Sequence, residues 1–143
     1  MQEIYTTIIV LVSFPLLWIL VIFLVGKLGS WRAISARFPF SAGMTSGERN
    51  ERKSFQSIRV GVSNYSGITN FESSSYGLHI SVFILFKPGH PDILIPWQEL
   101  RLGVSKWPLH TYKFEFESLP GRSFATYKAL GEWILMQKKI FVS

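Results

Sequence analysis

An uncharged apolar run from Ile8 to Val25 constrains this chain more than any other feature of its sequence. A bilayer core of about 30 Å is crossed by a helix of roughly 20 apolar residues, and the polar-poor segment extends back to Ile4. Most residues of the run are Leu, Ile, Phe or Val, and each of these favours insertion by roughly 0.3–0.6 kcal/mol near the bilayer centre. The run therefore predicts one membrane-spanning helix within residues 1–28, with a mild kink but no break at Pro15.

A cleaved signal peptide is the alternative for this segment. Such a peptide has a basic start, a shorter apolar core and a small-x-small cleavage site. Here the charged side chain that precedes the run is acidic, Glu3, and the small residues Gly26, Gly29 and Ser30 do not form such a site. The sequence favours an anchor that stays in the protein.

The charges that flank the run predict its orientation. Lys27, Arg32 and Arg37 follow the apolar segment, whereas no Lys or Arg precedes it. The positive-inside rule then places the short N-terminus outside the cell and the C-terminal part in the cytoplasm. We expect a single-pass protein of the inner or plasma membrane, in which these three bases contact the bilayer surface.

The remaining length and charge indicate a basic linker and one small domain. Residues 29–53 form the expected juxtamembrane linker, and residues 54–143 form the domain. Residues 26–53 hold six bases against two acids, so much of the net charge of +6 lies beside the predicted membrane helix. Within the linker, residues 31–40 are expected to lie as an amphipathic turn on the headgroups, and residues 41–53 to be flexible.

Hydrophobic alternation with a period of two predicts a mainly antiparallel β domain. The strongest strand is expected at residues 78–86 and, because its far end is apolar on both faces, it is placed centrally in the sheet. Turns are expected at residues 64–67 and 73–77. Further strands are expected at residues 55–62, 68–72, 93–95, 101–104 and 112–117.

A C-terminal helix is expected to close this sheet. Ser123 can cap a helix over residues 124–139. Leu130, Trp133, Ile134 and Gln137 fall on one side of it, and Lys128 and Glu132 lie on the other. The predicted fold is thus an N-terminal transmembrane helix followed by a β domain of six to seven strands and a closing α-helix.

This order of elements resembles the pleckstrin-homology-like (PH-like) superfold, including the GRAM and bacterial PH-like families. The segment GHPDILIPWQELRLGV carries the resemblance, and FKPGHP-x(3)-IPW, residues 86–97, is similar to a segment of uncharacterised bacterial single-pass membrane proteins. The resemblance implies a binding module for lipid, peptide or protein. It does not extend to a basic phosphoinositide loop of the eukaryotic kind, because the expected NYSG turn is uncharged.

Catalytic and cofactor motifs are absent from the sequence. It contains no nucleotide-binding glycine pattern, no nucleophile elbow and no cysteine, and its histidines are not spaced as metal ligands. His90 and Asp92 in KPGHPD offer the one candidate acid–base pair, although Pro88, Pro91 and the aspartate also suit a tight loop. We therefore expect no cofactor and no metal.

Two tryptophans that follow strand ends are the candidate contact residues. Trp97 is expected to pack in the core, and Trp107 either packs or contacts a partner. The pI is near 9.8, but no nucleic-acid-binding motif accompanies the basic charge, which argues against a nucleic-acid partner.

The leading hypothesis is a non-enzymatic adaptor or accessory subunit whose domain binds a protein partner or the lipid bilayer. The alternatives are a small membrane-bound enzyme that uses His90 and Asp92, and a structural subunit that acts through its helix.

Overall fold

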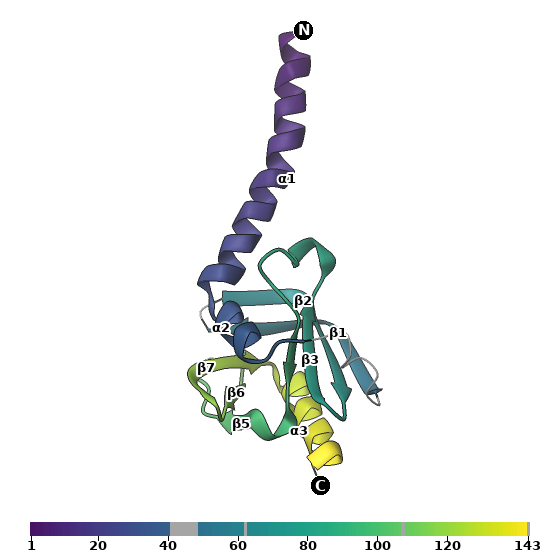
Figure 1. The fold of residues 1–143 in the computed structure, drawn as a ribbon, viewed down its shortest axis with the longest axis vertical. Helices are drawn as coiled ribbons and strands as arrows, with labels where there is room; N and C mark the ends of the chain where they lie inside the picture. The colour runs from purple at the N-terminus through teal and green to yellow at the C-terminus, as the bar shows by residue number, and fades with distance from the viewer. Residues whose placement is uncertain (41–48, 62, 107, 143) are drawn as a thin grey trace.

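One long helix projects from a small β domain in the computed structural model (Figure 1), which describes residues 1–40, 49–61, 63–106 and 108–142. Helix α1 (Gln2–Leu28) leads into a seven-stranded sheet, and helix α3 (Lys128–Val142) packs at the end of the domain far from the N-terminus. This confirms the predicted layout of an apolar helix, an antiparallel sheet and a closing helix.

Helix α1 is long and apolar enough to cross a membrane. It stays helical through Pro15, as predicted, and bends gently along its length (Figure 1). The Ser13 hydroxyl donates to the carbonyl of Val10 at 3.4 Å, so this polar side chain is satisfied within its own helix. Among the described residues of α1, only Gly26 is buried. The apolar surface of the helix is therefore left for something outside the chain to cover.

The sheet has the strand order β4-β3-β2-β1-β7-β6-β5, and every neighbouring pair is antiparallel. Strand β1 joins the two halves, because it pairs with β2 along its length and with β7 at its end. Membership of the PH-like superfold stays a prediction. The strands are β1 (Arg49–Val60), β2 (Ser63–Ser74), β3 (Gly77–Val82), β4 (Ile93–Ile95), β5 (Leu100–Gly103), β6 (Tyr112–Phe116) and β7 (Leu119–Thr126).

The strand predicted at residues 78–86 is shorter than expected. Strand β3 ends at Val82, Phe83 donates its backbone N–H to Ile68, and the 3-10 helix η2 (Ile84–Phe86) follows. The end of this segment has left the sheet: Phe83, Ile84 and Leu85 lie on the surface, and Phe86 packs partly against the core. The pattern that indicated a doubly buried strand thus belongs to an exposed turn.

Two boundaries of the predicted elements are wrong for identifiable reasons. The first turn comes directly after Val60, at Gly61, and not at residues 64–67, since Val60 pairs with Ser63 and Gly61 takes a positive φ of 61°. The closing helix starts later than residue 124, because Phe124 and Ala125 pair with β6 and β1 as part of β7. In both cases, strand pairing outweighs the local turn or cap signal.

The first part of the predicted linker belongs to the domain. Residues Ser30–Arg37 form helix α2, and the side chains of Trp31, Ile34 and Phe38 are buried in the core. These apolar side chains pack in the domain core, where the sequence predicted an amphipathic turn on the bilayer surface, and contact of the segment with headgroups stays a prediction. The core therefore begins N-terminal to the predicted boundary at residue 54. Most of the expected flexible segment, residues 41–48, lies outside the described residues.

Helix α3 packs as its periodicity predicts. The sides expected to be buried and exposed are both confirmed, and Lys128 and Glu132 approach to 4.0 Å on the outer side. The indole of Trp133 and the amide of Gln137 both donate to the carboxylate of Glu51, which joins α3 to β1. The buried residues of the helix are Leu130, Gly131, Trp133, Ile134 and Gln137.

Candidate functional site

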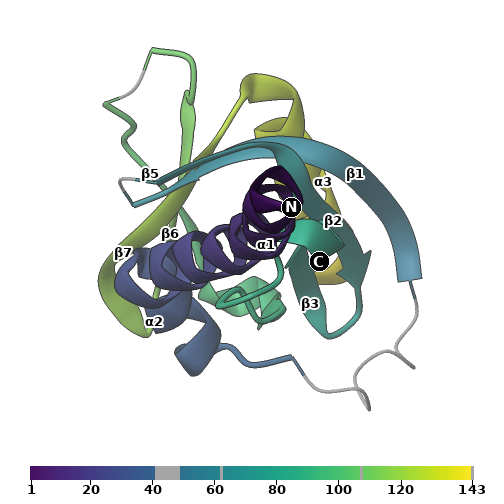
Figure 2. The same ribbon diagram turned by 90° about the horizontal axis from the view of Figure 1, so that it is seen from above.

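Helix α1 and the domain come into close contact where Gly26 of α1 meets Gly89 of the β3–β4 loop. A Cβ atom on Gly26 would overlap the carbonyl oxygen of Gly89, and one on Gly89 would lie 2.5 Å from the carbonyl oxygen of Phe23. Gly89 also has a positive φ of 72°, a conformation that favours glycine. The two glycines therefore allow backbone-to-backbone contact, and the loop lies beside α1 in both ribbon views (Figures 1 and 2).

Three aromatic side chains, the junction cluster, pack directly under this contact. Trp31 of α2, Tyr65 of β2 and His90 of the β3–β4 loop are all buried. Their ring centroids lie 5.3 Å (Trp31–Tyr65), 5.4 Å (Trp31–His90) and 5.4 Å (Tyr65–His90) apart. The cluster joins an element next to the anchor, a strand of the sheet and the loop that contacts α1.

The hydrogen bonds of His90 define its tautomer. Its Nδ1 lies 2.9 Å from the carbonyl of Pro88, which can only accept, so Nδ1 carries the proton. Its Nε2 then accepts from the hydroxyl of Tyr65 at 3.0 Å. Burial lowers the pKa of His90, and burial raises the pKa of Tyr65 to about 12. Both rings are thus neutral near pH 7 and act as fixed hydrogen-bonding groups.

The candidate acid–base pair of His90 and Asp92 does not form, and the loop interpretation that the sequence also allows is the one observed. The carboxylate of Asp92 accepts from Nε2 of His79 at 3.0 Å and pairs with Lys87, while His90 bonds to Tyr65 and Pro88. Burial acts to raise the pKa of Asp92, but the hydrogen bonds and charges of His79 and Lys87 outweigh it and hold this pKa low. The two side chains serve separate structural networks.

Two hydrogen bonds connect α2 and the residue that follows it to the KPGHPD loop and to strand β4. The indole of Trp31 donates to the carbonyl of Pro91 at 2.8 Å, and the backbone N–H of Leu94 donates to the carbonyl of Phe38 at 3.1 Å. Trp97 is buried as predicted and donates to the carbonyl of Ser74 at 2.8 Å. The FKPGHP-x(3)-IPW segment is therefore the part of the domain that holds the anchor end of the chain.

A second contact lies further along α1, toward the N-terminus. The indole N–H of Trp18 donates to the carbonyl of Leu85 at 3.1 Å, and the Trp18 ring lies 5.4 Å from that of Phe86. Sequence reasoning missed this contact. The one signal for it is that Trp18, a hydrogen-bond donor, lies inside an otherwise apolar run.

A basic pocket opens beside the end of α1. Gly61 on its rim lies against Ser30, the first residue of α2, and Arg122 donates to the hydroxyl of Ser30 at 3.2 Å. Sequence reasoning missed this pocket because its three bases come from separate parts of the chain. The residues that line it are Arg59, Gly61, Lys106, Lys113, Ser123 and Ala125.

The bases predicted to contact the membrane surface are exposed but differ in their surroundings. Lys27 lies over the ring of Phe23 at 5.2 Å, in the last turn of α1. Arg37 stacks on Phe38 at 5.1 Å. Contact of Lys27, Arg32 and Arg37 with headgroups stays a prediction. Trp107, the predicted partner contact, lies outside the described residues.

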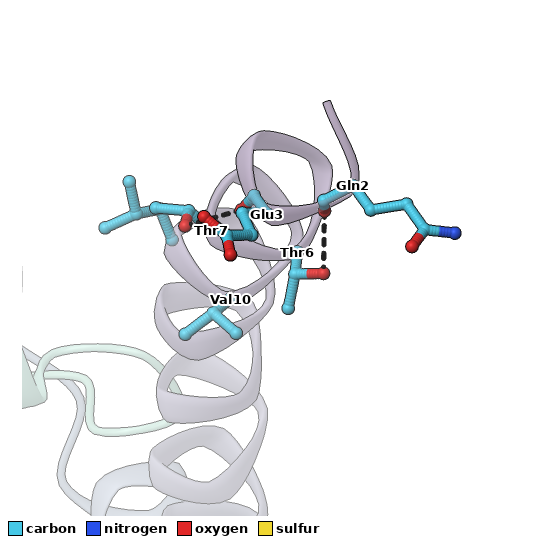
Figure 3. A pocket seen from close by; sticks show the side chains of 6 residues that line it. Gln2, Glu3, Thr6, Thr7 and Val10 are labelled. Atoms are coloured by element: carbon cyan, nitrogen blue, oxygen red, sulfur yellow. Dashed lines mark hydrogen bonds between the residues drawn. The ribbon is translucent and has the colours of Figure 1, made fainter.

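A shallow groove runs along the first turns of α1 and is lined by Gln2, Glu3, Thr6, Thr7, Val10 and Leu11 (Figure 3). The hydroxyls of Thr6 and Thr7 donate to carbonyls one turn earlier, at 3.0 and 2.8 Å. Because one helix supplies every lining residue and its hydroxyls are already bonded, the groove has the character of a helix surface and carries no argument for a site.

Comparison of the chain with known protein families, with curated proteins and with solved structures gives no match. Among the described residues, no group of three His, Asp or Glu side chains is arranged to hold a metal ion. The candidate site therefore rests on the geometry of the junction.

We expect the stability of the protein to depend on pH, because the junction cluster contains the buried, neutral His90. Because the pKa of His90 is lowered in the folded protein, the unfolded chain binds more protons below about pH 6.5. The free energy of unfolding should thus fall as the pH is lowered from 7 to 5. In His90→Gln, whose amide can bond to both Pro88 and Tyr65, this fall should be smaller.

Chemical denaturation of the full chain in detergent at a series of pH values measures the effect. The pH dependence that remains in His90→Gln comes from other groups: His110, whose pKa is lowered by burial and by the charge of Arg59, and, toward pH 5, carboxylates with a lowered pKa such as Asp92. If the free energy of unfolding of His90→Gln falls between pH 7 and pH 5 as steeply as that of the parent, the assignment of a neutral, buried His90 is contradicted.

Proposed function

We propose that this protein is a non-enzymatic, membrane-anchored binding protein whose domain is held against the cytosolic surface of the bilayer. Helix α1 crosses the inner or plasma membrane, with the N-terminus outside and the domain in the cytosol. One observation carries the proposal: an uncovered apolar helix of spanning length is joined to the domain by the contact between Gly26 and Gly89. An anchor packed in this way sets where the domain lies, whereas a flexible tether does not.

The charge distribution supports the cytosolic location. Lys27 ends the apolar helix, and Arg32 and Arg37 follow in α2. Bases close to the end of a membrane helix favour the cytoplasmic side. The acidic Glu3 lies at the other end of α1.

The basic pocket supports binding to the bilayer surface. Arg59, Lys106 and Lys113 line a pocket whose rim touches Ser30, immediately after the end of α1. If α1 crosses the bilayer, this pocket lies near the headgroups, where each base contributes about 1 kcal/mol of attraction to an anionic surface. The headgroup is the partner that the position and charge of the pocket favour.

The outer surface of α3 supports a role as an adaptor or accessory subunit. Met136, Ile140 and Val142 are between 44% and 50% exposed at the end of the domain far from α1 (Figure 1). A protein partner in the cytosol reaches this surface while the opposite end of the domain faces the bilayer. Trp107 remains a second proposed contact.

The hydrogen bonds of the junction favour a binding role over catalysis. Both ring nitrogens of His90 are used within the fold, and Asp92 is held by His79 and Lys87. A general base needs a lone pair directed at substrate. Because His90 and Asp92 are engaged in these hydrogen bonds within the fold, we propose no reaction for them.

Cysteine labelling in intact cells tests the proposed orientation. The chain contains no cysteine, so single cysteines can replace Gln2 at the N-terminus and Lys128 on α3. A membrane-impermeant maleimide should label Gln2→Cys in intact cells and should label Lys128→Cys only after the cells are opened. Labelling of Lys128→Cys in intact cells would contradict the cytosolic location.

Site-specific photo-crosslinking in native membranes tests the adaptor role. A benzophenone amino acid at Met136, which is exposed on α3, should give a discrete crosslinked protein band. The same group at Lys128, about two turns earlier on the same helix and paired with Glu132, should not. Equal products at both positions, or products at neither, would contradict the proposed partner surface.

A further inference from the structure

The loop after β3 begins with an exposed apolar turn. We call this turn, formed by residues 83–86, the β3–β4 tip. The exposed fractions of its side chains are 38% for Phe83, 73% for Ile84 and 60% for Leu85. The loop rises from the sheet toward the N-terminal end of α1 (Figure 1). Three large apolar side chains in succession on a surface turn are unfavourable in water. Something outside the chain is therefore expected to cover them.

The height of the tip along α1 indicates what covers it. The carbonyl of Leu85 accepts from the indole of Trp18, and Gly89, further down the loop, touches Phe23 and Gly26. At about 1.5 Å rise per residue, Trp18 lies about 10 Å along the helix from Val25, the last residue of the apolar run. The tip is thus level with the interior of the apolar segment.

We propose that the β3–β4 tip inserts into the cytosolic leaflet of the bilayer beside α1, as a second membrane contact of the domain. This inference rests on the proposed function, because it requires that α1 crosses the membrane. A depth of roughly 5–10 Å is the depth at which amphipathic elements lie at a membrane interface. The occupant of the surface is lipid, because the apolar side chains of α1 at the same level face the same surroundings.

The backbone of the tip is suited to apolar surroundings. Non-helical backbone groups in a bilayer have to be paired within the protein. The N–H of Phe86 donates to the carbonyl of Phe83 at 2.8 Å, and that of Lys87 donates to Ile84 at 3.2 Å. The carbonyl of Leu85 is paired by Trp18. The 3-10 turn and the indole therefore reduce the cost of taking this loop out of water.

A distorted position in β1 enlarges the apolar surface at the base of the tip. Phe55 has a positive φ of 55°, which is uncommon for a residue with a side chain, and lies in an irregular part of the β1–β2 pairing. Its ring is 64% exposed and lies 6.1 Å from that of Phe83. The irregular backbone thus directs an aromatic ring outward, next to the tip.

The charges around the tip agree with a lipid interface. Lys87 follows the tip directly, and Lys27 follows the apolar run of α1. Long basic side chains at the border of an apolar surface reach toward phosphate groups while their stems stay apolar. Both segments therefore change from apolar to charged as they approach the domain, α1 at Lys27 and the loop at Lys87, whose ammonium group pairs with Asp92.

The position of a fluorescent probe in vesicles tests the insertion. Because the chain has no cysteine, Ile84→Cys can carry a nitrobenzoxadiazole group in the full chain, at an exposed position where the change disturbs no packing. The protein is reconstituted in phosphatidylcholine and phosphatidylglycerol vesicles with spin-labelled acyl chains. Val10→Cys on α1 is the reference within the bilayer. Tyr76→Cys, at the opposite end of the β2–β3 hairpin, is the reference in water.

Insertion predicts a blue-shifted emission for the probe at Ile84 and quenching within about a factor of two of that at Val10. Water-like emission without quenching at Ile84, with strong quenching at Val10, would overturn the insertion and leave the anchor intact. Absence of quenching at both positions would overturn the anchor as well. A blue-shifted but unquenched probe at Ile84 would mean that a second copy of the chain covers the tip, and would overturn the assignment to lipid.

Discussion

The contact between Gly26 and Gly89 is the constraint on which the arrangement of this protein depends. Each glycine lacks the Cβ atom that would separate α1 from the β3–β4 loop, and Gly89 adopts a positive φ. Directly below, Trp31 and His90 continue the contact into the core through rings 5.4 Å apart. A long apolar helix and a β domain are thus packed as one unit, and the direction of the helix sets the direction of the domain.

Two surfaces lie beside helix α1: the exposed tip of the loop that makes this contact, and the basic pocket. The lower part of the loop, around Gly89 and His90, is buried against α1 and α2, while its tip at Ile84 rises along α1 and stays exposed. On the domain side, the basic pocket opens next to Ser30, where α1 ends. An apolar tip and a basic pocket near a helix that is long enough to span a membrane fit the proposed bilayer-bound domain, since one suits acyl chains and the other suits phosphate groups.

The sequence predicted the repeating features of this fold and missed those that depend on contacts distant in the chain. The buried face of α3 and the strand Ile93–Ile95 follow from local periodicity, so both were predicted correctly. The role of Trp31 was not, because a basic, aromatic segment reads equally well as a headgroup contact, and only packing against Tyr65 and His90 decides between the two. The apolar turn after Val82 is predicted as strand for a similar reason, since hydrophobicity does not distinguish a buried strand from an exposed apolar turn.

The most direct test of a domain packed on its anchor is the distance between the two, measured by pulsed electron paramagnetic resonance on the full chain in vesicles. Spin labels at Val12→Cys on α1 and Lys128→Cys on α3 report this distance in the otherwise cysteine-free chain. The parent should give one narrow distribution, Gly89→Ala should broaden it, and Gly121→Ala should not. Gly121 has a similar positive φ of 84° but no atom within 4 Å of an added Cβ, so it isolates the close contact from backbone strain. A broad distribution in the parent, or an equally narrow one in Gly89→Ala, would contradict the account.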